Sequence, residues 1–255
     1  MDLRSVRAVV TGGASGLGRA TVETILAAGG RAAIVDRPAS AGADVAKTLG
    51  AAAVFTPADV TGETDVTQAM ERAHQALGGI NVLVNCAGIG TAMKTLGRSG
   101  PAKLEDFTRV IQVNLVGTFN AIRLAAAYMA KNTPSPEGER GVIVNTASVA
   151  AFDGQIGQAA YSASKGGIVG MTLPVARDLA EHGIRVCTIA PGIFETPMLG
   201  TLPEPVRVSL AKQVPFPQRL GQPAEYAALV AHIITNGMLN GETIRLDGAI
   251  RMQPR

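Results

Sequence analysis

Short apolar runs alternate with longer amphipathic segments along most of this chain. The apolar runs predict seven strands, at about 7–10, 31–36, 52–56, 81–85, 141–146, 184–189 and 242–246. Apolar positions at helical spacing predict helices between them, at about 16–28, 41–49, 64–77, 104–130, 161–181 and 222–235. This alternation predicts a parallel sheet with helices on both faces. We therefore expect a single doubly wound α/β domain over residues 1–255, with a seven-stranded parallel sheet.

Three polar segments interrupt this alternation. Residues 90–103 and 132–140 are rich in turn-forming residues and are expected to be surface insertions. The third segment, 193–221, carries five prolines around one short helical stretch. Loops of this length in a compact domain are often lids. We expect 193–221 to be a substrate lid, with an ordinary surface connection as the alternative.

The first predicted strand leads directly into the glycine-rich turn 11–18, and a helical pattern follows it. Gly12 permits a tight turn, while Gly16 and Gly18 let a pyrophosphate approach the backbone and let the helix pack on the sheet. The free N–H groups at the start of the helix attract an anion. Asp36 ends the second strand eighteen residues after Gly18, close to the spacing of the acid that binds a ribose 2′-hydroxyl. This Rossmann-type unit predicts dinucleotide binding.

Asp36 also bears on which dinucleotide is bound. Its carboxylate would repel a 2′-phosphate, which favours NAD over NADP. Arg37 follows immediately, and a guanidinium there would instead accommodate that phosphate. Because the carboxylate occupies the end of the strand, we predict NAD.

Tyr161 and Lys165 lie four residues apart, and Ser148 lies thirteen residues before Tyr161. A separation of four residues is about one helical turn, so the phenol and the ammonium face the same way. Tyrosine titrates near pH ~10, and one cation at about 4 Å supplies about 4 kcal/mol at an effective dielectric near 20. We therefore expect Lys165 to lower the pKa of Tyr161 and make it a proton acceptor.

Charge and composition narrow the classes of partner. The net charge is +3 without a long basic run, and aromatic residues make up 4% of the chain, which gives no sign of a nucleic-acid footprint. No apolar run reaches the ~18 residues of a membrane span. The first strand begins close to Met1, so no leader is expected. We predict a cytoplasmic protein without nucleic-acid or membrane partners.

The cysteines and histidines do not indicate a metal site. Cys86 and Cys187 lie in or at the end of apolar strands, where free thiols are expected. The three histidines are scattered over helical segments without ligand spacing.

Several motifs follow the glycine turn in one order. They are Asn85-Cys86-Ala87-Gly88, Asn114, Ser148, Tyr161 with Lys165, and Pro191-Gly192. Together they resemble the short-chain dehydrogenase/reductase family across nearly the whole chain. The resemblance implies an NAD-dependent, usually tetrameric oxidoreductase. Further stretches resemble a branch that oxidises 3-hydroxyacyl-CoA thioesters and tolerates hydroxysteroids and secondary alcohols; they are 57–61, 145–152, 157–174, 213–220 and 244–254.

The resemblance also implies roles for single residues. Ser148 would hydrogen-bond the substrate oxygen, and Tyr161 would take the proton of the hydroxyl. Lys165 would lower the pKa of the tyrosine and hold the nicotinamide ribose. Asn114 would position a water molecule that relays the proton outward.

The resemblance implies a cofactor cleft as well. Its expected lining is Gly12, Ser15, Gly16, Leu17, Gly18, Asp36, Asp59, Val60, Cys86, Ala87, Gly88, Tyr161, Lys165, Pro191, Gly192, Phe194 and Thr196. Ser15 and Leu17 would line the pyrophosphate, and Asp59 with Val60 the adenine. Phe194 and Thr196 would close on the nicotinamide amide.

The insertions carry cations with a possible role in substrate binding. Lys94, Arg98 and Lys103 lie in the first insertion, and Arg207 and Lys212 in the third. We hypothesise that some of them contact the phosphates of coenzyme A. Solvated loop charges are the alternative.

Two rival functions stay open at this point. The chain could be a steroid or xenobiotic carbonyl reductase, or an NAD-binding scaffold for a partner protein. The presence of Ser148, Tyr161 and Lys165 argues against a scaffold alone. A nucleophilic role for Ser148 is disfavoured, because no histidine or carboxylate is placed to complete a triad.

Overall fold

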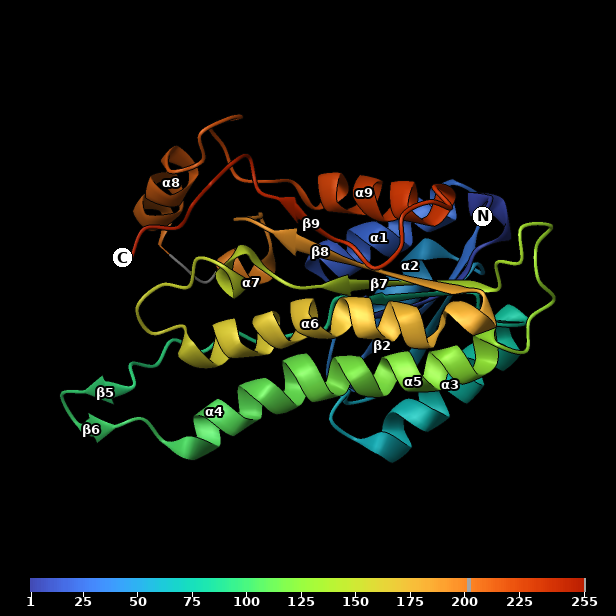
Figure 1. Ribbon diagram of the computed structural model, residues 1–255, viewed down its shortest axis with the longest axis horizontal. Helices are drawn as coiled ribbons and strands as arrows, with labels where there is room; N and C mark the ends of the chain where they lie inside the picture. Colours follow the sequence, from blue (N-terminus) through green and yellow to red (C-terminus); the bar gives the residue numbers. More distant parts are fainter. Residues whose placement is uncertain (201–202, 255) are drawn as a thin grey trace.

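The computed structural model describes residues 1–200 and 203–254. Its seven-stranded sheet is parallel throughout, in the order β3–β2–β1–β4–β7–β8–β9 (Figure 1). The strands are β1 (Arg7–Thr11), β2 (Arg31–Asp36), β3 (Ala53–Pro57), β4 (Val82–Asn85), β7 (Gly141–Thr146), β8 (Ile184–Pro191) and β9 (Thr243–Leu246). The predicted doubly wound α/β fold is therefore confirmed.

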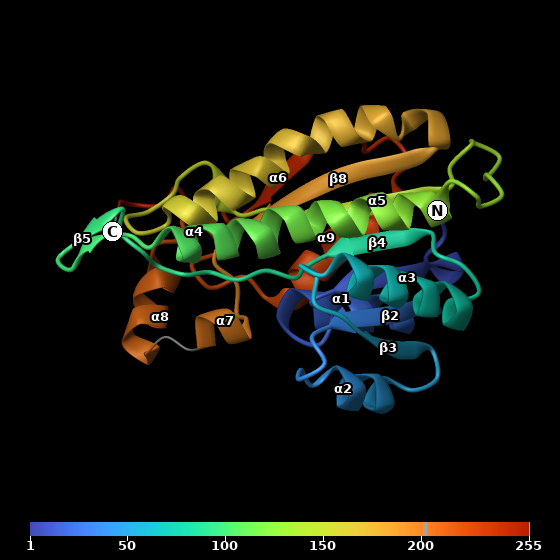
Figure 2. The same ribbon diagram turned by 90° about the horizontal axis from the view of Figure 1, so that it is seen from below.

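Helices cover both faces of the sheet (Figures 1 and 2). One face packs against α1 (Gly16–Ala27), α2 (Gly42–Leu49) and α9 (Pro223–Thr235). The other packs against α3 (Glu63–Leu77), α5 (Gly117–Met129) and α6 (Ala159–Asp178). Along β1, Ala8 and Val10 face the first group and Val9 the second. Because both faces of the sheet are covered, the central strands β1, β4 and β7 are largely buried apolar runs, which is why the sequence pattern located them.

The helix predicted over 104–130 is interrupted by a change of winding. It consists of α4 (Leu104–Ile111), a π-helical turn (Gln112–Val116) and α5. An 18-residue window of this run has a mean hydropathy of 1.3, so by length and composition it meets the criterion for a membrane span. The sequence had indicated no such segment. Half of that window is buried inside the protein, as in a core helix.

Two insertions contain more structure than the sequence predicted. Residues 90–103 include a small antiparallel hairpin of β5 (Leu96–Gly97) and β6 (Gly100–Pro101). Two-residue strands show no period that a sequence pattern can reveal. Among the described residues of 193–221 there are two helices, α7 (Pro197–Gly200) and α8 (Glu204–Lys212), where one was expected.

The parallel strands bring distant motifs to one end of the molecule. The glycine turn follows β1, Asp36 ends β2 and Asn85 ends β4. Ser148 lies two residues beyond β7. The β5–β6 hairpin, α7, α8 and the C-terminus lie at this same end in both views (Figures 1 and 2).

Candidate active site

The glycine turn packs directly against the end of β4. Gly12 has a φ of 65°, and a Cβ at that position would lie 2.8 Å from the backbone nitrogen of Ala87. A Cβ on Gly18 would overlap the carbonyl oxygen of Gly12. These two positions therefore require glycine, and the close packing places Cys86 and Ala87 beside the turn.

Asp36 contacts the same turn. Its carboxylate accepts hydrogen bonds from the backbone nitrogens of Ala14 (3.2 Å) and Arg37 (2.8 Å). Ser15 is the N-cap of α1, but its side chain makes no capping hydrogen bond. The positive end of α1 is therefore not neutralised by a side-chain cap, and it lies near an acid suited to a ribose. These residues fit a dinucleotide.

The segment after β3 forms a second turn at this edge. The carboxylate of Asp59 accepts hydrogen bonds from the backbone nitrogen (2.9 Å) and hydroxyl (2.7 Å) of Thr61. These bonds lower the pKa of Asp59. Val60 is buried, and a Cβ on Gly117 would lie 2.9 Å from its side chain. The turn thus fixes both residues expected near the adenine.

Asn114 lies in the π-helical turn and anchors the segment that follows β4. Its Oδ1 accepts from the nitrogen of Ile89 (2.8 Å), and its Nδ2 donates to the oxygen of Ile89 (2.9 Å) and to Ser164 Oγ (3.0 Å). A Cβ on Gly88 would lie 3.3 Å from Asn114 Oδ1 and 3.6 Å from Lys165 Nζ. Because both amide hydrogens are engaged, a water held by Asn114 must bind to an acceptor oxygen.

Ser148 and Tyr161 meet at the ends of a single connector. Ser148 Oγ caps a short 3-10 helix (Val149–Ala151) by accepting from the nitrogen of Ala150 at 3.1 Å. Tyr161 is in the first turn of α6. Burial raises the pKa of Tyr161, and a hydrogen bond with Ser148 partly opposes this effect.

Lys165 is buried one turn further along α6. Its Nζ donates to the backbone oxygen of Thr146 at 2.8 Å and lies 5.7 Å from the centroid of the Tyr161 ring. Burial lowers the pKa of Lys165 to about 8. The predicted convergence of Ser148, Tyr161 and Lys165 is therefore present in the structure.

The expectation that Lys165 lowers the pKa of Tyr161 is wrong. The pKa of Tyr161 is raised, and burial is the main cause. The cost of desolvating a phenolate outweighs the attraction of one cation here. In addition, the ammonium of Lys165 is directed to the carbonyl of Thr146.

A buried hydrogen-bond network behind Lys165 was not expected from the sequence. Thr146 Oγ1 lies 2.7 Å from the hydroxyl of Tyr226, and Cys86 Sγ donates to that hydroxyl at 3.6 Å. Tyr226 is fully buried, and burial raises its pKa well above the ordinary value. In the sequence, Tyr226 occupies an ordinary apolar position of the helix α9. Its polar role is visible only from its hydrogen bond with Thr146 in the structure.

The start of the predicted lid meets the glycine turn. A Cβ on Gly16 would lie 3.4 Å from Pro197 Cδ and 3.5 Å from Thr196 Cβ. Phe194 is buried and packs against Gly221, so its ring is part of the core. Pro191 ends β8, and Gly192 packs tightly against Asp247.

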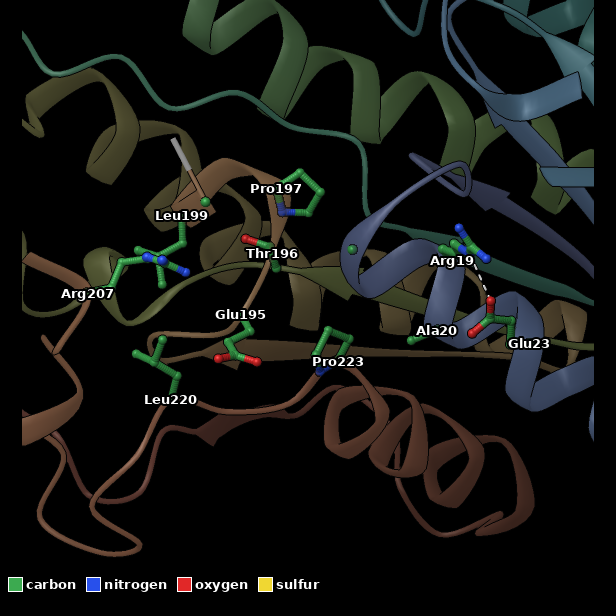
Figure 3. Close-up of a pocket in the computed structure, with 12 residues that line it drawn as sticks. Arg19, Ala20, Glu23, Glu195, Thr196, Pro197, Leu199, Arg207, Leu220 and Pro223 are labelled. Carbon is green, nitrogen blue, oxygen red and sulfur yellow. Dashed lines mark hydrogen bonds and ion pairs between the residues drawn. The ribbon is translucent and has the colours of Figure 1, made fainter. Parts of the chain in front are cut away.

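A cavity of about 490 Å³ opens beside this contact (Figure 3). Gly16 and Thr196 connect it to the glycine turn, and Arg207 reaches into it from α8. Its other lining residues are Arg19, Ala20, Glu23, Glu195, Pro197, Leu199, Gly200, Leu220 and Pro223. Ser148, Tyr161 and Lys165 do not line it. Within residues 1–200 and 203–254, no three His, Cys, Asp or Glu side chains gather as metal ligands.

Comparison with known proteins identifies the family. Residues 7–206 match the family model described as short chain dehydrogenase. This chain is a short-chain dehydrogenase. It is 63% identical to a protein of Bos taurus named 3-hydroxyacyl-CoA dehydrogenase type-2, over 99% of this chain and 98% of the relative.

Two solved structures of the family have the same fold. The 3-hydroxyacyl-CoA dehydrogenase type-2 from Mycobacterium avium is 46% identical, with a TM-score of 0.93 over 97% of this chain and 96% of that one. A 3-ketoacyl-(acyl-carrier-protein) reductase from Brucella melitensis, complexed with NADH, is 30% identical, with a TM-score of 0.86 over 97% and 98%. Family membership and this cleft support a nicotinamide cofactor for the short-chain dehydrogenase described here.

Proposed function

We propose that this protein catalyses the reversible, NAD-dependent oxidation of 3-hydroxyacyl-CoA to 3-ketoacyl-CoA. The convergence of Ser148, Tyr161 and Lys165 beside the glycine turn carries this proposal. The substrate class is supported by the 63% identity to the bovine protein.

The side chains divide the work of the reaction. Ser148 hydrogen-bonds the substrate oxygen where negative charge develops. Tyr161 accepts the proton of the hydroxyl, and Lys165 holds the nicotinamide ribose. When bound, the oxidised nicotinamide accepts the hydride. Tyr161 would lose its proton more readily beside the positively charged nicotinamide, since that charge opposes the effect of burial on the pKa of the tyrosine.

NAD is preferred over NADP because of the charge at the end of β2. Asp36 lies against the glycine turn through Ala14, where a carboxylate favours a ribose hydroxyl and repels a 2′-phosphate. Arg37 adjoins it, but only its backbone nitrogen bonds to that carboxylate.

Exposed cations at the site end of the molecule support a role in binding coenzyme A. Lys94 and Arg98 are exposed around the β5–β6 hairpin, and Lys103 precedes α4. On the opposite side, Lys212 ends α8 and Arg207 lines the cavity. Charge reversal of Lys94 and Arg98 should raise KM for an acyl-CoA but not for a small alcohol.

A homotetramer is the proposed assembly. The α4–α5 run and α6 lie side by side on one face (Figure 1), and they expose Val116, Phe119 and Leu173. Gly170 on α6 has open space around it. Light scattering after gel filtration should give a mass near four times 26.1 kDa, and Phe119→Asp should lower it.

Substrate comparison tests the function directly. With NADH, kcat/KM for acetoacetyl-CoA should exceed that for a ketosteroid. The reverse order would favour the second candidate, a hydroxysteroid or secondary-alcohol dehydrogenase. A Tyr161→Phe protein that still performs the cellular task would favour a scaffold for a partner protein.

A further inference from the structure

The connector between Ser148 and Tyr161 is the segment that sets the distance between these two side chains. It begins with the short 3-10 helix after Ser148 and runs to the first turn of α6. A shift of this connector would move the hydrogen-bond donor relative to the base. Contacts that hold the connector are therefore contacts that hold the reaction geometry.

Arg245 on β9 contacts the first part of this connector through Asp153 and Phe152. Nη2 of Arg245 lies 2.6 Å from Asp153 Oδ2, and its Nε lies 2.7 Å from Asp247 Oδ2. Its guanidinium carbon lies 5.1 Å from the centroid of the Phe152 ring. About four-fifths of the side chains of Arg245 and Asp153 are buried, with 21% and 22% exposed. The pair is thus more shielded than an ordinary surface ion pair.

The C-terminal segment holds the middle of the connector. The backbone nitrogen of Ile156 donates to the oxygen of Pro254 at 3.0 Å, and Gln155 Nε2 donates to the oxygen of Gln253 at 2.9 Å. The segment is itself anchored, because Ile250 is buried and its carbonyl oxygen accepts from Arg245 Nη2 at 3.0 Å.

The first insertion supports the other end of the connector. The backbone nitrogen of Met93 donates to the oxygen of Gly157 at 2.8 Å. The connector is therefore held by the C-terminal segment and by residues 90–103. Two of its apolar side chains, Phe152 and Ile156, stay about half exposed at 48% and 49%, although they lie in a segment that is otherwise bonded on both sides.

We propose that residues 245–254 form a clamp on the connector, and that the clamped Phe152 and Ile156 form the wall that contacts the aliphatic chain of the substrate. Arg245 is a positioning residue, since it acts on Ser148 and Tyr161 through Asp153. The C-terminal segment is a determinant of chain-length preference. This inference rests on the proposed acyl-CoA function.

The planar guanidinium of Arg245, with its several N–H donors, is needed to hold the connector in place. One side chain contacts Asp153, Asp247 and the carbonyl of Ile250 at the same time. The guanidinium also covers the ring of Phe152. Lysine offers a point charge and cannot reproduce the fork, so Arg245→Lys should recover only part of the lost function.

Steady-state kinetics on four variants test the clamp. Arg245→Met and Asp153→Asn should each lower kcat for acetoacetyl-CoA about tenfold, because small displacements of reacting groups are costly. KM for NADH should stay within twofold. The double variant should be no worse than Arg245→Met alone, since the contact between Arg245 and Asp153 is already absent in that single variant. Deletion of 252–255 should lower kcat/KM about tenfold more for a long-chain 3-ketoacyl-CoA than for acetoacetyl-CoA.

Arg4→Met is the matched control. Arg4 pairs with Asp2 at 2.7 Å near the N-terminus, at the opposite end of the molecule (Figure 1), and its removal should leave all constants unchanged. Wild-type kinetics in the clamp variants, or an equal loss for both chain lengths on deletion, would overturn the clamp and leave the proposed function standing. A wild-type enzyme inactive on acetoacetyl-CoA would overturn both.

Discussion

The ammonium of Lys165 donates a hydrogen bond to the backbone oxygen of Thr146 at 2.8 Å, although its sequence spacing directs it toward Tyr161. Thr146 ends β7 and also bonds to Tyr226 through its side chain. The position of Lys165 therefore depends on the last residue of a central strand and on a tyrosine from α9.

The buried charge of Lys165 should make the stability of the protein without cofactor depend on pH. Its pKa falls from 10.5 to about 8 on folding, which corresponds to about 3 kcal/mol. Between these values the unfolded chain binds more protons, so this group makes the free energy of unfolding rise with pH. The advantage of Lys165→Met over the wild type should fall by about 3 kcal/mol from pH 8 to 10.5 in urea titrations. A constant difference between the two proteins would contradict this prediction.

Tyr226→Phe should weaken catalysis without touching the cofactor cleft directly. The substitution removes the hydrogen bond to Thr146 and the weaker one from Cys86, and should lower the free energy of unfolding by about 1–2 kcal/mol. A less constrained Thr146 carbonyl should lower kcat severalfold. Tyr128→Phe is the control, because Tyr128 lies on α5 beside His74 and should retain full activity. Equal effects of the two substitutions would reject the proposed role of Tyr226.

Asp36→Asn should shift the cofactor preference toward NADP. The substitution removes the charge that repels a 2′-phosphate and weakens a bond to the ribose hydroxyl worth about 1.5–3 kcal/mol. We expect kcat/KM to fall about tenfold with NADH and to rise with NADPH. Asp44→Asn, on the exposed side of α2, should change neither value. A wild-type preference for NADPH would show that the assignment of NAD is wrong.

Gly12→Ala should abolish tight NADH binding. Gly12 and Gly78 have similar positive φ values of 65° and 74°, so alanine costs about 1–2 kcal/mol of backbone strain at both. A Cβ on Gly12 would meet Ala87 in the cleft, whereas a Cβ on Gly78 would meet open space. Fluorescence titration should show at least a tenfold weaker Kd for NADH only in Gly12→Ala.

The fold was predictable because the central strands β1, β4 and β7 are buried on both faces and are therefore apolar runs in the sequence. The cleft was predictable because parallel strands place their carboxyl ends together, so Gly12, Asp36 and Ser148 had to converge. The balance of pKa effects at Tyr161 was not predictable, because it depends on burial and on the direction of the lysine. The ion pair between Arg245 and Asp153 could not be predicted from the sequence either, since these residues lie far apart in the chain.

Two short elements could not be predicted from the sequence pattern. They are the β5–β6 hairpin, with strands of two residues, and the π-helical turn around Asn114. Neither has a period long enough to detect. The turn nevertheless lets Asn114 bond both backbone groups of Ile89, so a local irregularity supports the strand end that faces the cofactor.

The decisive measurement is the rate of acetoacetyl-CoA reduction by NADH in Tyr161→Phe beside the wild type. The account predicts rapid turnover by the wild type and a loss of about 10³-fold in kcat for the variant, because general acid–base catalysis contributes about 10²–10⁴-fold. The Kd for NADH should be unchanged. A variant that keeps wild-type kcat would contradict the central role of Tyr161.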